Sequence, residues 1–384
     1  ETFSVKAQDT QRRYERELAE RRRLHNLVQE LRGNIRVFCR VRPPTDKEDA
    51  GTECVSFPND GEIRIDRGGQ GRGAKTKTWA FDRVFPFDTT QPQIYAEISE
   101  LVTSVLDGYD VCIFAYGQTG SGKSFTMIGT PENRGCNLRA LRDLFARSKA
   151  RREEVADVIT VSVVEVYNEA IRDLLQPRGT KSKKKLEVRR GEFGNYVPDL
   201  TTVTVQGDDE VLELMAISDE ARSQTATDMN DQSSRSHMLM SVTVTSTNLS
   251  TKGVTRGQLH LVDLAGSERV DKSGAKGQAL KEAQNINKSL SALGDVVAAR
   301  AQNAPHIPFR NSTLTHLLQD SLSHDSKTLM FCCISPVLYN ADESTCTLNF
   351  ASRVGTVELG KASVKHVSDK GSGVGGSSTT PRKS

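Results

Sequence analysis

The feature that most constrains this chain is a glycine-rich segment, AYGQTGSGKS at residues 115–124. Gly117 and Gly122 bracket four residues, and a lysine and a serine follow, which fits the pattern GxxxxGK[ST]. The apolar run DVCIFAYG at 110–117 leads into it and is typical of a strand buried on both faces. Because a helical pattern follows, we expect a loop between a buried strand and a helix N-terminus.

Such a loop has the chemistry of a phosphate cradle. Glycines lack Cβ atoms, so backbone N–H groups can turn toward phosphate oxygens, and the helix N-terminus adds partial positive charge. The lysine can reach β- and γ-phosphates, and the serine hydroxyl suits Mg²⁺. A chance Gly/Ser turn is the alternative, and the flanking strand and helix disfavour it. The candidate nucleotide-binding residues here are Gly117, Gln118, Thr119, Gly120, Ser121, Gly122, Lys123, Ser124 and its aromatic neighbour Phe125.

Two other segments supply groups that such a loop needs. The apolar strand LHLVDL ends in Asp263, a candidate to hold Mg²⁺ through water, and Gly266 soon after can offer a backbone N–H to a γ-phosphate. The polar segment NDQSSRSH at 230–237 carries two neighbouring hydroxyls, Ser233 and Ser234, which can complete a Mg²⁺ shell and hold a water. Taken alone, a strand-end Asp is an ordinary turn cap, and a hydroxyl-rich loop is an ordinary solvated turn.

The alternation of strand and helix patterns predicts the fold class. Apolar or alternating runs indicate strands at 35–42, 110–117, 158–167, 239–246, 258–264 and 328–335. The longest helical pattern, at about 276–303, has an apolar face formed by Leu280, Ala283, Ile286, Leu290, Leu293 and Val297. We therefore expect an α/β fold, with a central, mostly parallel twisted sheet covered by helices on both faces and preceded by an N-terminal helix.

The chain divides into three parts. Residues 1–33 are rich in Arg, Glu, Gln and Leu, and we expect a helix that ends a coiled-coil stalk; an isolated surface helix is the alternative. Three leucines in this helix follow the spacing of a coiled-coil seam: Leu24, Leu27 and Leu31. Residues 34–362 are expected to form one globular unit. Residues 363–384, rich in Gly, Ser, Thr and Lys, are expected to be a disordered tail.

Composition excludes several classes of protein. The formal net charge is only +3, so a strongly basic nucleic-acid binder is not indicated. Seven cysteines without a CxxC pair favour a reduced, cytoplasmic protein. No apolar run approaches the length of a membrane span, and we find no signal-peptide pattern.

Taken together, these segments resemble the kinesin motor domain. GQTGSGKS is similar to the P-loop of that family, NDQSSRSH matches its switch I pattern NxxSSRSH, and DLAGSE at 263–268 matches its switch II. RVRP at 40–43 is similar to the adenine-site motif RxRP; alone it is a strand followed by a proline turn. NINKSL, HIPFRNSTLTHLLQDSL and TLNFASR resemble further kinesin segments. The likeness extends over about residues 35–360.

The resemblance implies a Mg²⁺-dependent ATPase whose cofactors are ATP and Mg²⁺. Arg40 and Pro43 would flank the adenine, with Arg42 in the same motif, and Asn230 opens switch I. The implied metal ligands are Ser124, Ser234 and Asp263.

The resemblance also implies the groups that act in hydrolysis. Ser233 would place the attacking water, and Glu268 would accept its proton through a second water. Arg235 and Glu268 resemble the family's gate pair, which comes together when the two switches close. Gly266 would sense the γ-phosphate.

On the filament side, the resemblance implies microtubules as the partner and a cytoskeletal location. Lys281, Lys288 and Arg310 are the candidate contacts with acidic tubulin; for each, a solvated charge is the alternative. Because a helix precedes the motor, the chain is similar to C-terminal-motor kinesins, which implies a homodimer and movement toward the minus end. Thr313 and Gln284 stand where the family usually has basic residues.

Two other functions remain open from the sequence. A P-loop GTPase switch would need an NKxD-like guanine-reading segment, and NINKSL has no Asp at the required position. A non-motile microtubule cross-linker with slow ATPase activity is the second alternative. The run KSKKK at 181–185 either is a solvated loop or meets acidic tubulin tails.

Overall fold

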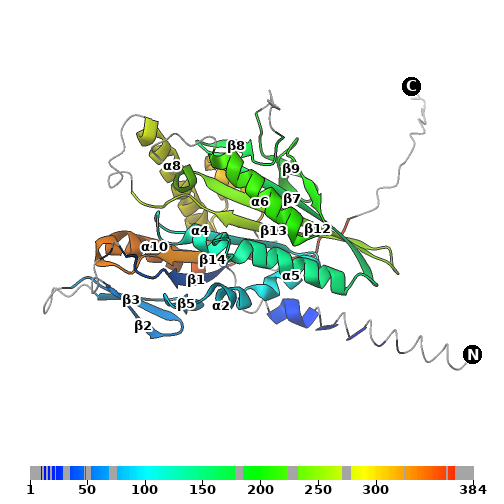
Figure 1. The fold of residues 1–384 in the computed structure, drawn as a ribbon, viewed down its shortest axis with the longest axis horizontal. Coiled ribbons are helices and arrows are strands. Elements are labelled where there is room, and N and C mark those ends of the chain that lie inside the picture. Colours follow the sequence, from blue (N-terminus) through cyan, green and yellow to red (C-terminus); the bar gives the residue numbers. More distant parts are fainter. Residues whose placement is uncertain are drawn as a thin grey trace, which may run out of the picture.

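The structure, a computed structural model, describes residues 10, 13, 16, 17, 20, 21, 23–28, 35–46, 48, 53–68, 76–177, 185–223, 232–269, 278–323, 326–359 and 362–367. Its centre is a sheet with the strand order β11-β7-β12-β13-β6-β14-β1-β5, in which β8 also pairs with β7 (Figure 1). The strands from β13 to β5 are parallel, and the strands from β11 to β13 are antiparallel. The sheet is therefore mixed, with a parallel half that carries the glycine-rich loop.

The strand bounds follow the apolar runs of the sequence. The main sheet contains β1 (Ile35–Val41), β5 (Arg83–Phe85), β6 (Asp110–Tyr116), β7 (Val155–Tyr167), β8 (Ala170–Asp173), β11 (Val203–Val205), β12 (His237–Asn248), β13 (Val254–Asp263) and β14 (Ser326–Ile334). All residues of β1 and β14 are buried, as expected for strands covered on both faces. Two smaller sheets contain β2 (Val55–Asn59), β3 (Glu62–Asp66) and β4 (Thr76–Ala80), and the hairpin of β9 (Arg189–Gly191) and β10 (Gly194–Tyr196).

Helices cover both faces of the sheet, and each face has its own hydrophobic core. One core contains apolar residues of α2 (Gln91–Ala96), α3 (Ser99–Leu106), α4 (Lys123–Met127), α5 (Cys136–Ala150) and α6 (Asp208–Ser223). The other contains residues of α8 (Gln278–Ala301), α9 (Thr313–Leu317) and α10 (Ala341–Gly355). Short 3₁₀ helices are η2 (Gln232–Arg235), η3 (Phe309–Asn311) and η4 (Leu338–Asn340). The expected α/β architecture is confirmed.

The long helix α8 packs through the face that the sequence predicted. Leu290, Leu293 and Val297 are buried, together with Val296, and Ile286 packs against the same core. The opposite face is exposed at Lys281 and Lys288. One side of α8 therefore packs into the core beside α9 and α10, while its charged side faces solvent.

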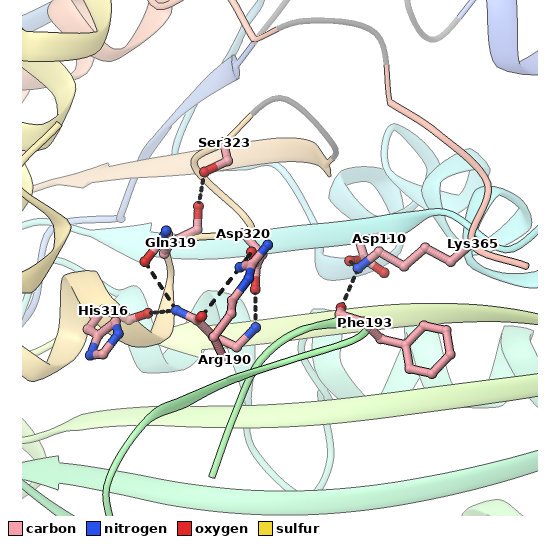
Figure 2. A network of polar contacts seen from close by, with 9 residues as sticks. Asp110, Arg190, Phe193, His316, Gln319, Asp320, Ser323 and Lys365 are labelled. Atoms are coloured by element: carbon pink, nitrogen blue, oxygen red, sulfur yellow. Dashed lines mark hydrogen bonds and ion pairs between the residues drawn. The ribbon is translucent and has the colours of Figure 1, made fainter. Parts of the chain in front are cut away.

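The expected disordered tail from residue 363 is wrong for its first residues. His366 forms a β-bridge with Thr255, and the backbone N–H of Arg256 donates to the carbonyl of Lys365. The Lys365 ammonium binds the buried Asp110 carboxylate and donates to the Phe193 carbonyl at 2.7 Å (Figure 2). Backbone pairing and an ion pair thus hold residues 362–367 on the fold, and the ion pair forms because the buried Asp110 carboxylate needs a cationic partner. Residues 368–384 lie outside the described residues.

Close to this pair, further polar contacts join the β9–β10 hairpin to α9 and the segment after it. Arg190 pairs with Asp320, and the Asn195 side-chain amide donates to the His316 carbonyl at 2.7 Å (Figure 2). The ring of Phe193 also lies 5.0 Å from the guanidinium carbon of Arg256. These contacts hold the hairpin against α9, the segment that follows it, and β13.

The N-terminal segment is helical at its described positions and contacts the globular unit through Asn26 and through His25, whose Nε2 lies 3.3 Å from the Glu100 carbonyl. Asn26 is 5% exposed, and its amide nitrogen donates to Asp107 at 3.1 Å. The ammonium of Lys327 donates to the Asn26 side-chain oxygen and, at 3.0 Å, to Ser104. Leu24 and Val28 on the same segment are about half exposed, at 50% and 46%.

Candidate nucleotide site

The glycine-rich loop lies where the sequence placed it, between β6 and α4. Gly122 is the N-cap of α4 and has a φ of 95°, which a side chain would disfavour. A Cβ on Gly117 would lie 2.1 Å from the backbone oxygen of Cys333 on β14. Both glycines are therefore required by the backbone path, which brings the loop tightly over the ends of two parallel strands.

Lys123 is held inside this loop. The residue is 7% exposed, and its ammonium donates to the Gln118 carbonyl at 2.9 Å. Burial lowers the pKa of the Lys123 ammonium, while the nearby Asp263 carboxyl opposes that shift. A desolvated cation beside loop N–H groups is suited to binding phosphate oxygens.

Asp263, at the end of β13, lies against the first turn of α4. The Ser124 hydroxyl donates to one Asp263 oxygen at 2.5 Å, and the residue is 3% exposed. Its other oxygen, Oδ1, is buried and has no hydrogen-bond partner among the described residues. Burial raises the pKa of the Asp263 carboxyl, against the pull of Lys123 and the bond from Ser124. A buried, incompletely bonded carboxylate beside a hydroxyl is a set of hard oxygen donors that fits Mg²⁺.

The segment 263–268 lies directly on the loop. The N–H of Ser267 donates to the Gly117 carbonyl at 3.1 Å, and the Gly266 N–H donates to the Ser234 carbonyl at 3.0 Å. A Cβ on Gly266 would lie 2.3 Å from side-chain atoms of Thr119 and Glu268. The three segments singled out in the sequence are thus joined by hydrogen bonds in one place.

The two residues of the expected gate pair bind different elements in this structure. Glu268 accepts from the Thr119 backbone N–H at 2.8 Å and from the Thr119 hydroxyl at 2.6 Å. Arg235 donates to Glu282 of α8 at 2.8 Å. Switch I is therefore bonded to α8, and switch II is bonded to the P-loop.

The residues expected near the adenine lie in two environments. Arg40 is 7% exposed, donates to Gln91 and Thr126 at 3.0 Å each, and lies 5.0 Å from the ring of Phe125, which is 39% exposed. Arg42 instead forms a bidentate pair with Glu48, and the hydrogen bond from Arg42 lowers the pKa of Glu48 to about 2. Pro43 is exposed. Phe125 and Pro43 therefore offer apolar surface at the rim of the site, and Arg40 supports Phe125 from beneath.

Some of the sequence-predicted residues cannot be placed. Asn230 and the side chain of Ser233 lie outside the described residues, and so does most of the run KSKKK. Gly120 has a φ of 75°, and Gln118 and Ser121 are buried in the loop.

The candidate filament contacts share one side of the fold. Lys281, Lys288 and Arg310 are exposed, the first two on α8 and the third on η3, which contacts α8. Thr313 does not extend to solvent as a lysine would. Its N–H and hydroxyl donate at 2.8 Å to the side chain and the carbonyl of Glu169.

Several residues of the site were missed by sequence reasoning. Gln91 and Thr126 hold Arg40, and Glu282 holds Arg235. Gln91 and Glu282 carry no local signal, because each reaches its partner only through the packing of distant elements. His237 gave a signal, since it ends the NDQSSRSH segment, but no role was assigned to it.

The loop, the strand-end Asp263 and the two segments bonded around them define a P-loop nucleotide-binding protein of the motor type. A family profile described as the kinesin motor domain matches residues 40–357. The chain therefore belongs to the kinesin family and contains its motor domain. Among the described residues, no helix is both long and apolar enough to span a bilayer.

Relatives and solved structures agree with this assignment. The chain is 50% identical over 367 residues to kinesin-like protein KIN-14E of Oryza sativa, covering 94% of this chain. It is 49% identical to KIN-14R of Arabidopsis thaliana, covering 92% of this chain. In each case it spans 33% of the relative's length.

Two solved structures match nearly the whole fold. The first is titled as the structure of a fast kinesin; it has a TM-score of 0.78 and 38% identity, with 88% of this chain and 96% of that chain covered. The second is titled as the C-terminal motor and motor homology domain of Kar3Vik1 fused to a synthetic heterodimeric coiled coil. It has a TM-score of 0.79 and 37% identity, with 92% and 95% covered.

Proposed function

We propose that the protein is a microtubule motor of the kinesin-14 type, which couples ATP hydrolysis to movement toward the minus end. The observation that supports this most directly is the bonding of three loops in one site. Switch II is bonded to the P-loop through Ser267 and Gly117, and to switch I through Gly266 and Ser234. A change at a terminal phosphate then reaches both switches, and through Arg235 it reaches α8.

Mg²⁺ would be held by Ser124, Asp263 and Ser234. When bound, this ion would neutralise charge that develops on the phosphate oxygens. Asp263 keeps one oxygen without a hydrogen-bond partner among the described residues, and its neighbour Lys123 balances the buried charge. ATP would lie with its phosphates on residues 117–124 and its base near Arg40, Arg42, Pro43 and Phe125.

In hydrolysis the chain would mainly position the reactants. Ser233 and Ser234 would hold the attacking water, and Glu268 would accept its proton through a second water once released from Thr119. Closure would require Arg235 to leave Glu282 and meet Glu268. Because that exchange breaks the ion pair between switch I and α8, it would link the chemical step to the filament-facing helix.

Binding to tubulin would use the exposed bases on and beside α8. Lys281, Lys288 and Arg310 are solvated cations that an acidic surface would attract. Gln284, exposed on the same helix, and Thr313, bonded to Glu169, contribute no positive charge there. We expect weaker and less salt-sensitive binding than a chain with lysines at both positions would have, because fewer charges take part.

The N-terminal helix would form the neck of a homodimer, with residues 34–362 as the motor domain. Leu24 and Val28 are exposed apolar side chains at a spacing that suits a partner helix, and Asn26 attaches the helix to the motor. Movement of that helix relative to the motor would produce the stroke. We place the protein in the cytoplasm, on microtubules.

A polarity-marked gliding assay with ATP, run beside an ATPase assay, tests the proposal. Motion consistent with minus-end direction, with turnover stimulated by microtubules, is expected. Binding to microtubules without motion or stimulated turnover would favour the non-motile cross-linker. GTP outcompeting ATP would favour the GTPase alternative.

A further inference from the structure

His237, the last residue of the switch I motif and the first of β12, is buried where switch I, switch II and α8 meet. It is 3% exposed, and its two ring nitrogens each have a partner from a different element. The backbone N–H of Ala265, in switch II, lies 3.0 Å from Nδ1. The Ser289 hydroxyl, on α8, lies 2.7 Å from Nε2.

The partners decide which nitrogen carries the proton. A backbone N–H can only donate, so Nδ1 accepts, and the neutral ring must then carry its hydrogen on Nε2 and donate it to Ser289. The Ser289 hydroxyl in turn donates to the Ile286 carbonyl at 2.7 Å. A single chain of hydrogen bonds, all pointing the same way, therefore runs from switch II through His237 into α8.

Burial keeps this ring neutral, which the chain requires. It lowers the pKa of His237 to about 3, with Arg222 and Lys123 adding to the shift. A protonated ring has no acceptor for Ala265. The contact is therefore a fixed structural link over the pH range in which the protein works.

The next backbone N–H in switch II, that of Gly266, has a different partner. Gly266 donates to the Ser234 carbonyl here, and it is the group expected to turn toward a γ-phosphate. When it turns, the peptide one residue earlier stays bonded to His237. A shift of residues 263–268 must then displace the imidazole, and with it the hydroxyl that is bonded into α8.

We propose that His237 is a positioning residue that couples switch II to α8 through Ser289. Its two ring nitrogens bond Ser289 and Ala265, and it acts by moving the filament-facing helix when the backbone at Ala265 moves. The inference deepens the proposed motor function, but it concerns a coupling that exists within the chain whether or not a filament is present.

The test compares two His–Ser pairs, the buried pair of His237 on β12 with Ser289 on α8 and a part-buried pair that joins β12 to β13. Ser289→Ala removes only the α8 end of the chain and leaves the nucleotide residues intact. The matched control is Ser241→Ala, because Ser241 on β12 bonds Nδ1 of His260 on β13 at 2.9 Å, away from the switches. Hydrogen exchange of α8 amides is measured with ADP and with a non-hydrolysable ATP analogue, together with basal and microtubule-stimulated turnover.

We expect Ser289→Ala to reduce the nucleotide-dependent difference in α8 exchange about tenfold, the effect of losing one well-formed buried hydrogen bond. The difference at residues 263–268 and the basal turnover should persist, while microtubule stimulation falls. His237→Asn retains an acceptor for Ala265 but does not reach Ser289, so it should act like Ser289→Ala, and the double variant should add nothing.

Three results would overturn the inference. The first is that hydrogen exchange of α8 in the wild type is the same with ADP and with the ATP analogue. The second is that Ser289→Ala leaves this nucleotide-dependent difference unchanged, and the third is that Ser241→Ala reduces it as much as Ser289→Ala does. The last would mean that the loss of either serine hydroxyl has the same general effect on the fold. The proposed motor function fails separately, if microtubules do not raise the turnover of the wild-type chain.

Discussion

The Glu268 carboxylate provides the sharpest test of the site, because in this structure it occupies P-loop donors. It accepts two hydrogen bonds from Thr119, at 2.8 and 2.6 Å. Bonds to a charged acceptor contribute about 1.5–3 kcal/mol each, and we use the lower end because Glu268 is only half-buried. Roughly 3 kcal/mol therefore favours the arrangement in which Glu268 is held by the P-loop.

Glu268→Ala should separate binding from hydrolysis. The substitution frees the Thr119 N–H and removes a negative charge near the phosphates, so nucleotide affinity should be unchanged or tighter. Loss of the proton acceptor and of the gate pair should slow hydrolysis by about 100- to 10,000-fold, which corresponds to about 3–5 kcal/mol. Stopped-flow binding of a fluorescent ATP and quench-flow measurement of cleavage give the two quantities separately.

Thr119→Val is the control for a merely structural effect. It removes the hydroxyl donor but keeps both the backbone N–H and the Glu268 carboxylate. We expect it to slow cleavage by no more than about tenfold, the effect of one lost hydrogen bond. If Glu268→Ala weakened ATP binding by the same factor as cleavage, or if Thr119→Val reproduced it in full, the role assigned to Glu268 would be wrong.

Three further predictions follow from buried charges. Lys123→Ala should weaken retention of the nucleotide itself by at least about 100-fold, since a desolvated ammonium is lost; equilibrium binding of fluorescent ADP checks this. Between pH 7 and pH 5, the wild type should lose about 2 kcal/mol of unfolding free energy relative to His237→Asn, because only the unfolded histidine, with its ordinary pKa, takes up a proton in that range. Urea unfolding of both proteins at both pH values measures this loss. A stability difference between the two proteins that is the same at pH 7 and pH 5 would refute the prediction. Lys365→Ala should destabilise the fold by about 3 kcal/mol, because the Asp110 carboxylate stays buried without its cation, and an unchanged melting temperature would show that the C-terminal segment does not dock.

Much of the fold could be predicted from local pattern. Strands buried on both faces, such as β6 and β14, appear in the sequence as continuous apolar runs. The helix α8 appears as apolar residues that recur every three to four positions. The tail boundary failed for a physical reason. Residues 363–367 contain only two apolar residues, Val364 and Val367, and show no core-forming pattern; they are ordered by backbone pairing with β13 and by the pair between Lys365 and Asp110.

The sequence alone determined which chemistry this protein can perform. The glycines, lysine and serine of residues 117–124 have conformational and charge properties that act over a few bonds, so their order is enough to predict a phosphate loop. Only the tertiary structure decided which partners these groups have. Glu268 on Thr119, Arg235 on Glu282 and His237 between Ala265 and Ser289 are contacts between elements far apart in the chain, and such contacts depend on how the sheet orders its strands and where the helices pack.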